Sequence, residues 1–109
     1  MKDAVEFYAQ TMAKVKQESE NQNGYYSVDL VSRVCLEAIK DRFPDSSFDD
    51  LVEPTLQLLT TAMYLELMYT EAADKYGVTL AQHNFAALKY INYWDAIVKP
   101  RLILKEDYK

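Results

Sequence analysis

The chain has 109 residues, of which half are hydrophobic and only five are glycine or proline, and its formal net charge is −5. This length and composition support one hydrophobic core and argue against disorder. The single cysteine, Cys35, excludes an internal disulfide, and the charged start "MKDAVEFYAQ" lacks the apolar run of a signal peptide. We therefore expect one domain over residues 1–109, located in the cytoplasm.

Two helices are expected in the first half of the chain. The first covers about residues 3–18, and steps of three or four residues separate the members of its apolar seam: Val5, Tyr8, Met12 and Val15. Gly24, within the polar stretch "ENQNGYY", is expected to end it. The second helix begins after a cap at Ser27 and stops just before Pro44. Cys35 lies on its apolar side and is interpreted as a buried, unreactive thiol.

A long third helix is predicted from Pro54 to about Tyr76, closed by Gly77. Two apolar arcs run along it roughly opposite each other, one with Leu56, Leu59, Met63 and Leu67, the other with Leu58, Leu65, Tyr69, Ala73 and Tyr76. A helix with two apolar faces needs neighbours on both sides, so we expect it at the centre. Glu66 lies level with Tyr90 of the next helix, and it is expected to accept a hydrogen bond from a tyrosine hydroxyl or to stay protonated.

The fourth helix starts at the capping-box pair Thr79 and Gln82 and is predicted to continue to about Val98, because Pro100 follows. Residues 98–109 then form a short C-terminal tail, extended or as an added turn, whose apolar "LIL" run needs a surface to lie against. These segments predict an all-α fold: a compact, four-helix-bundle-like single domain with a long central third helix and a short tail.

Charge is distributed unevenly along the chain. Seven acidic and no basic residues lie between Arg42 and Lys75, whereas six basic and three acidic residues lie from Lys75 to the end. The middle and the end are therefore complementary, either within one chain or between two. No basic patch is available for a phosphate backbone, so we expect no nucleic-acid ligand. The acidic side chains Glu66, Glu71 and Asp74 disfavour a membrane span over residues 55–77.

Several large apolar side chains project where the helical pattern places polar residues. Phe7 and Phe85 each fall on the charged face of their own helix, and Tyr64 and Met68 fall one turn apart on the polar strip of the third helix. Together with an acidic group they form the predicted partner-binding set, which is Phe7, Tyr64, Met68, Phe85, Asp49, Asp50 and Glu53.

The interpretation that follows is a non-catalytic protein-binding module, such as an adaptor, an assembly subunit or a small inhibitor, with an acidic, tyrosine-rich helical surface. Its partner is another protein, and we expect a homodimer with the long helix or the fourth helix near the axis. Nine lysines against three arginines, with nine tyrosines, suit an AT-rich source such as a bacteriophage or mobile element. An alternative is an acidic DNA mimic that inhibits a host nucleic-acid enzyme, built on residues 43–74.

Catalytic motifs are scarce. No Gly-rich phosphate loop or paired metal-ligand motif occurs, so we expect no enzyme activity, cofactor or metal. His83, the single histidine, falls on the apolar side of its helix. Glu71 and Asp74 form an ExxD step that resembles half of the magnesium-binding pattern of MazG-type all-α nucleotide pyrophosphohydrolases. Those enzymes place an EExxE cluster on the preceding helix, where this chain has Glu37 and Asp41. The resemblance implies, as an alternative, a minimal metal-dependent nucleotide hydrolase.

Overall fold

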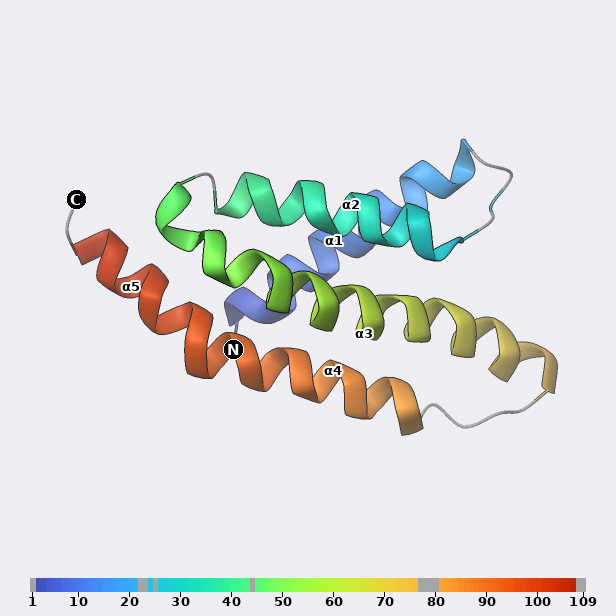
Figure 1. Cartoon of the computed structure of the whole chain (residues 1–109). Coiled ribbons are helices and arrows are strands. Elements are labelled where there is room, and N and C mark those ends of the chain that lie inside the picture. Colours follow the sequence, from blue (N-terminus) through green and yellow to red (C-terminus); the bar gives the residue numbers. More distant parts are fainter. Residues whose placement is uncertain (1, 22–23, 25, 44, 77–80, 108–109) are drawn as a thin grey trace.

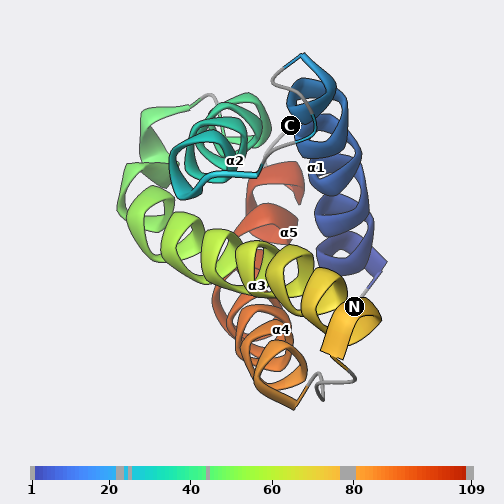
Figure 2. The same cartoon turned by 90° about the vertical axis from the view of Figure 1, so that its right-hand side faces the viewer.

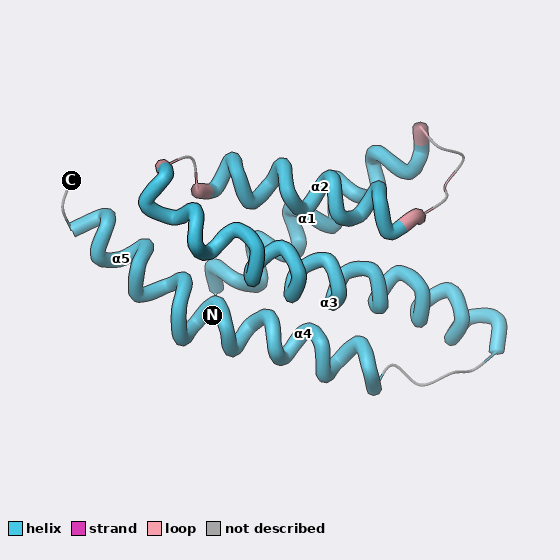
Figure 3. The backbone as a smooth tube through the Cα atoms, in the orientation of Figure 1, coloured by secondary structure: helices cyan, strands magenta, loops and turns pink. Residues whose placement is uncertain are grey.

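The computed structural model describes the backbone of residues 2–21, 24, 26–43, 45–76 and 81–107, and side-chain packing for residues 4–21, 24, 26–43, 45–68 and 85–103. Over this backbone all regular structure is helical (Figures 1 and 3), which confirms the all-α prediction. The elements in chain order are α1 (Lys2–Glu20), α2 (Val28–Arg42), the 3₁₀ turn η1 (Ser46–Phe48), α3 (Asp49–Tyr76), α4 (Ala81–Tyr93), the π-helical segment η2 (Trp94–Val98) and α5 (Lys99–Asp107).

Helix α3 occupies the centre of the molecule. It lies between α2 and α4 in both views (Figures 1 and 2), and α1 contacts α2, α3 and α4. Helices α4 and α5 continue each other as one bent rod on the side of α3 away from α2 (Figure 1). The molecule measures 50 × 29 × 20 Å. The bundle-like fold with a long central third helix is therefore confirmed.

Local hydrogen bonds set the junction between α1 and α2. Gly24 has a φ of 75°, which costs a glycine little, and its N–H donates to Ser19 O over 2.7 Å. The Ser27 side chain accepts from the Leu30 N–H over 3.0 Å and so caps α2. Both the break near Gly24 and the Ser27 cap agree with the prediction.

The start of α3 differs from the prediction, which placed it at Pro54. Asp45 caps η1 by accepting from the Ser47 N–H, and η1 passes directly into α3 at Asp49. Asp49 and Asp50 lie in the first turn, where the helix dipole favours negative charge. Pro54 therefore lies inside the helix, and the first turns of α3 stand at an angle to the rest (Figure 1), as expected for a proline within a helix.

The last helix also extends further than predicted. Instead of stopping near Val98 and releasing a tail over residues 98–109, the chain stays helical through Pro100 to Asp107. We attribute this continuity to η2, whose wider turn joins the Lys99 N–H to Trp94 O and ends just before the proline. A loosened turn leaves room for the proline ring, which clashes with a carbonyl in a regular α-helix. The predicted tail is thus mostly the helix α5.

Aromatic side chains from distant parts of the chain meet in the core. The fully buried Trp94 ring lies 5.3 Å from the ring of Phe7, 6.0 Å from that of Phe43 and 6.0 Å from that of Tyr90. Phe43 also stacks on Phe48 of η1 at 5.3 Å. Through these contacts Trp94 joins α1, the end of α2 and α4.

The position of Phe7 contradicts the exposure on which its place in the predicted partner-binding set depended. Its side chain is only 8% exposed, whereas Val5, predicted for the apolar seam, is 52% exposed. The buried face of α1 is turned by one residue from the predicted seam, and it includes Thr11. The Thr11 hydroxyl donates to Phe7 O over 2.7 Å, so this polar group is satisfied although it is buried. The predicted seam of Val5, Tyr8, Met12 and Val15 left Thr11 out, and it lies to one side of Phe7.

Candidate protein-interaction surface

The rod formed by α4, η2 and α5 keeps one constant face toward the core. Its buried side chains recur at every fourth position: Ala86, Tyr90, Trp94, Val98 and Leu102. In a straight α-helix each four-residue step rotates the stripe by about 40°, so the stripe would wind around the helix. The π-helical turn of η2 takes up additional residues and returns the stripe to the core side.

The opposite side of the rod is exposed and nearly uncharged. Eight residues between positions 85 and 103 are exposed, and we call them the outer face: Phe85, Leu88, Lys89, Asn92, Ala96, Ile97, Pro100 and Ile103. Six of the eight are apolar, and the four large ones are 44–62% exposed. The rod is therefore apolar both toward the core and toward solvent.

Helix α2 shows how an ordinary solvated face looks in the same molecule. Its exposed residues are Val28, Asp29, Arg33, Glu37, Lys40, Asp41 and Arg42, of which six are charged. Charge of this kind is typical of the solvent side of an amphipathic helix. An apolar strip such as the outer face is instead typical of a surface that contacts another molecule.

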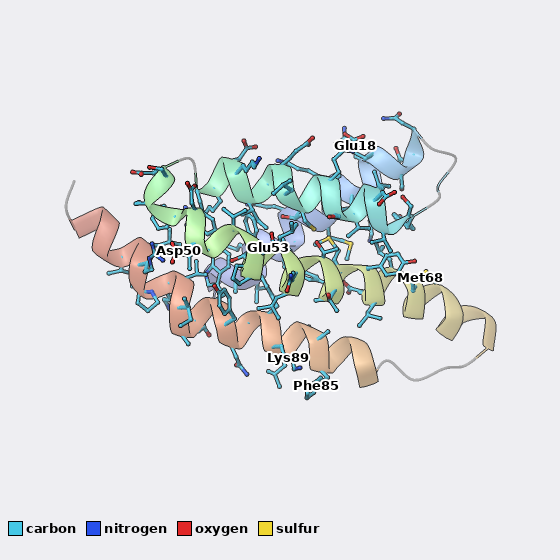
Figure 4. All side chains as sticks on the ribbon, viewed as in Figure 1. Glu18, Asp50, Glu53, Met68, Phe85 and Lys89 are labelled. Atoms are coloured by element: carbon cyan, nitrogen blue, oxygen red, sulfur yellow. The ribbon has the colours of Figure 1, made fainter. Side chains whose placement is uncertain are left out.

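The single cation of the outer face lies against its largest apolar side chain. Lys89 Nζ is 4.8 Å from the centre of the Phe85 ring, which makes a cation–π contact. Figure 4 shows both side chains on the side of α4 that faces away from the other helices. Asn92, the other polar residue, lies near the middle of the face. Charge is thus confined to one end of the outer face.

A small apolar groove lies between α1 and α4. Its volume is about 180 Å³, and it is lined by Val5, Tyr8, Ala87, Tyr90 and Ile91. Small-molecule sites usually measure about 300–1,000 Å³, so the groove suits a single side chain of a partner better than a metabolite.

Hydrogen bonds under this groove tie α1 to its neighbours. The Tyr8 hydroxyl donates to Glu66 Oε2 over 2.5 Å, and the Tyr90 hydroxyl donates to Ala4 O over 2.7 Å. A tyrosine hydroxyl does satisfy Glu66, as predicted, but it comes from the first helix rather than from Tyr90. The two tyrosine rings lie 5.8 Å apart.

Burial raises the pKa of two tyrosines and of the thiol in this region. It raises the pKa of Tyr8, and the hydrogen bond to Glu66 raises that pKa further. Burial likewise raises the pKa of Tyr90, and it raises the pKa of the Cys35 thiol to about 11. Cys35 has no exposed surface, which agrees with the predicted buried thiol. None of these three groups has a pKa near neutrality, where a general acid or base is most effective.

Part of the predicted acidic surface serves a contact within the chain. Arg101 of α5 donates to Asp50 Oδ2 over 2.6 Å and to Ser47 O, and its guanidinium lies 5.6 Å from the Phe48 ring. The hydrogen bond from Arg101 holds the pKa of Asp50 below its usual value. Arg101 of the basic end thus pairs with Asp50 of the acidic middle inside one molecule.

The structure does not gather the predicted partner-binding residues into one surface. Phe7 is buried, and Tyr64 is half-buried and packed against the core. Met68 is exposed on α3, and Figure 4 shows it well apart from Phe85 on the outer side of α4. The acidic residues lie exposed near the start of α3, far from Met68: Asp49, Asp50 and Glu53. Of the seven, Phe85 alone belongs to the outer face.

Three large apolar residues of the outer face were outside the predicted partner-binding set, namely Leu88, Ile97 and Ile103, of which Ile103 was predicted only as part of the apolar "LIL" tail. Ile97 and Ile103 can be placed on one face only if the helix continues through Pro100. A signal for that continuity is present in the sequence, because the apolar residues from Ala86 to Leu102 repeat every four positions without interruption.

The alternative metal site cannot be placed, because the side chains of Glu71 and Asp74, like that of His83, lie outside the described residues. The predicted helix ends at Gly77 and Thr79 lie outside them too. Among the described residues, no group of three or more His, Cys, Asp or Glu side chains is arranged to hold a metal ion. Within that same part of the chain, every helix is too short or too polar to cross a bilayer.

The chain matches no protein-family model, no curated protein and no solved structure. The composition and geometry of the outer face are therefore the basis for a functional proposal.

Proposed function

We propose that this protein is a non-catalytic protein-binding module whose binding surface is the outer face of α4, η2 and α5. The observation that carries the proposal is the composition of that face, where six of eight exposed residues are apolar and Lys89 is the only charge. Exposed apolar area is unfavourable in water, and a partner that covers it gains the free energy of its burial. An adaptor, an assembly subunit or a small inhibitor would each use such a face.

This proposal moves the binding surface away from the acidic, tyrosine-rich one expected from the sequence. Tyr8 and Tyr90 bond to groups inside the molecule, and Asp50 is engaged by Arg101. The remaining acidic residues at the start of α3 stay solvated, and they favour solubility.

Site-specific photo-crosslinking tests the proposal. A benzophenone amino acid replaces Ile97 on the outer face or, as a matched control, Val28 on α2; the two side chains are 44% and 50% exposed. Illumination of cells that express each variant should give protein adducts from position 97 and few from position 28. Mass spectrometry of the adducts then separates a second copy from a foreign protein. Equal adducts from both positions, or none from position 97, would contradict the proposal.

A further inference from the structure

We infer that the partner of the outer face is a second copy of this chain, bound antiparallel across a two-fold axis that passes near Asn92. The inference rests on the proposed function, because it names the occupant of the same face. Three observations support it: the absence of acidic residues on the face, the amide at its middle, and the large and small residues on either side of that amide.

Charge limits the surfaces on which two copies can meet. Each copy carries a net charge of −5, so contact between acidic surfaces would set like charges against each other. Exposed carboxylates occur on α1, on α2 and at the start of α3, whereas the outer face has none. Among the described helices, the α4–η2–α5 rod therefore offers the surface on which two copies can approach without opposing carboxylates.

Asn92 is suited to pair with its own copy. A side-chain amide has both donors and an acceptor, so Asn92 can donate to and accept from the partner's Asn92 at a two-fold axis. A lysine or a glutamate at this position would meet its own charge instead. A lone asparagine in an apolar helical stripe also fixes the register of paired helices.

An axis at Asn92 places large residues opposite small ones. In an antiparallel pair, a residue four positions before the axis meets the residue four positions after it, so Leu88 faces the partner's Ala96. By the same rule Ile97, five positions after the axis, faces the partner's Ala87. Alternation of large and small side chains lets two helices pack closely.

The size of the outer face sets the expected affinity. Residues 85–103 span about 27 Å at 1.5 Å per residue, and the strip is one helix wide. A stable interface buries about 800 Å² on each partner, and such a strip buries less than that. We therefore expect a dimer that dissociates on dilution through the micromolar range.

Analytical ultracentrifugation of the full chain tests whether a second copy binds to the outer face. At hundreds of micromolar the protein should sediment at twice 12.6 kDa and shift toward 12.6 kDa on dilution. Ile97→Glu should weaken association by about tenfold or more, because it buries a carboxylate in an apolar contact. Val28→Glu on α2 should leave association unchanged. Circular dichroism should show that both variants are helical. A monomer at hundreds of micromolar, or a dimer that Ile97→Glu leaves unchanged, overturns the inference.

Disulfide trapping tests the position of the axis. Asn92→Cys should give a covalent dimer under mild oxidation, because two thiols at a two-fold axis can reach disulfide geometry. Ile103→Cys lies far from the axis and should stay largely monomeric, as should the natural chain, whose one thiol is buried. Failure of Asn92→Cys to crosslink, or an equal yield from Ile103→Cys, overturns the placement of the axis.

Failure of the dimer and failure of the proposed function give different results. A monomer that crosslinks to a foreign protein from position 97 overturns the second copy and keeps the protein-binding module. A monomer that crosslinks to nothing from position 97 overturns both.

Discussion

The hydrogen bond from Tyr8 to Glu66 joins α1 to the central helix beneath the groove. Replacing Tyr8 by phenylalanine removes only the hydroxyl and takes one donor from a partly buried carboxylate. We expect Tyr8→Phe to lower the free energy of unfolding by about 1–3 kcal/mol, measured by urea denaturation. Adding Glu66→Leu should recover part of that loss, because both polar partners are then gone. A Tyr8→Phe variant with unchanged stability would show that the bond contributes nothing.

Alkaline pH should destabilise the protein through its buried phenols. The pKa values of Tyr8 and Tyr90 are raised in the folded state, so both stay protonated when the unfolded chain ionises its tyrosines near pH 10. Above that pH the unfolded state binds fewer protons, and the free energy of unfolding falls as the pH rises. In a spectrophotometric titration, some of the nine tyrosines should ionise only on unfolding. Ionisation of all nine near pH 10 with helicity intact would contradict the burial of these two rings.

Single residues were predicted well where their partner lies within one turn. Ser27 caps its own helix, and the buried thiol of Cys35 follows from its apolar neighbours. Glu66 was given the right kind of partner but the wrong tyrosine, because helical periodicity fixes the direction of a side chain and not the helix that lies there. Phe7 was misplaced for a related reason, since Thr11 bonds to a carbonyl of its own helix and so can be buried.

Among the helices, two of the three prolines account for the main departures from prediction. Pro54 was predicted to begin a helix and Pro100 to end one, yet Pro54 lies inside α3 and Pro100 lies inside the rod. A bend in the helix accommodates the first, and the π-helical turn of η2 accommodates the second. The sequence signal that outweighs the proline in the rod is the uninterrupted four-residue repeat, which only a continuing helix can bury on one side.

Arg101 anchors the start of α5 to η1 and to the first turn of α3. We expect Arg101→Ala to speed amide hydrogen exchange in α5 and in residues 46–50, and to change the rest of the molecule little. Exposed ion pairs contribute little to global stability, so the effect should stay local. Arg101→Lys keeps the charge but cannot reproduce both contacts. Its amide exchange in α5 should therefore be faster than in the natural chain and slower than in Arg101→Ala. Unchanged protection in α5, measured by mass spectrometry, would contradict the anchor.

At the scale of the whole molecule, α3 and the α4–η2–α5 rod are both apolar on two sides, and the described part of the chain covers both sides of α3 only. Helix α3 lies between α2 and α4, and the described members of its two apolar arcs are buried or half-buried, as its predicted central position requires. The α4–η2–α5 rod packs on one side and leaves six apolar residues in water on the other. Sequence periodicity alone could not separate these cases, because it shows that a face is apolar and not whether a neighbour covers it.

The outer face is proposed to bind a protein, and that protein is proposed to be a second copy of the chain. Two-dimensional NMR of the backbone amides, recorded from micromolar to hundreds of micromolar, tests it residue by residue. We predict concentration-dependent shift changes confined to residues 85–103 and to the adjacent Val5, while the amides of α2 stay fixed. Changes that map to α2 or to the acidic start of α3, or spectra that do not change with concentration, would contradict it.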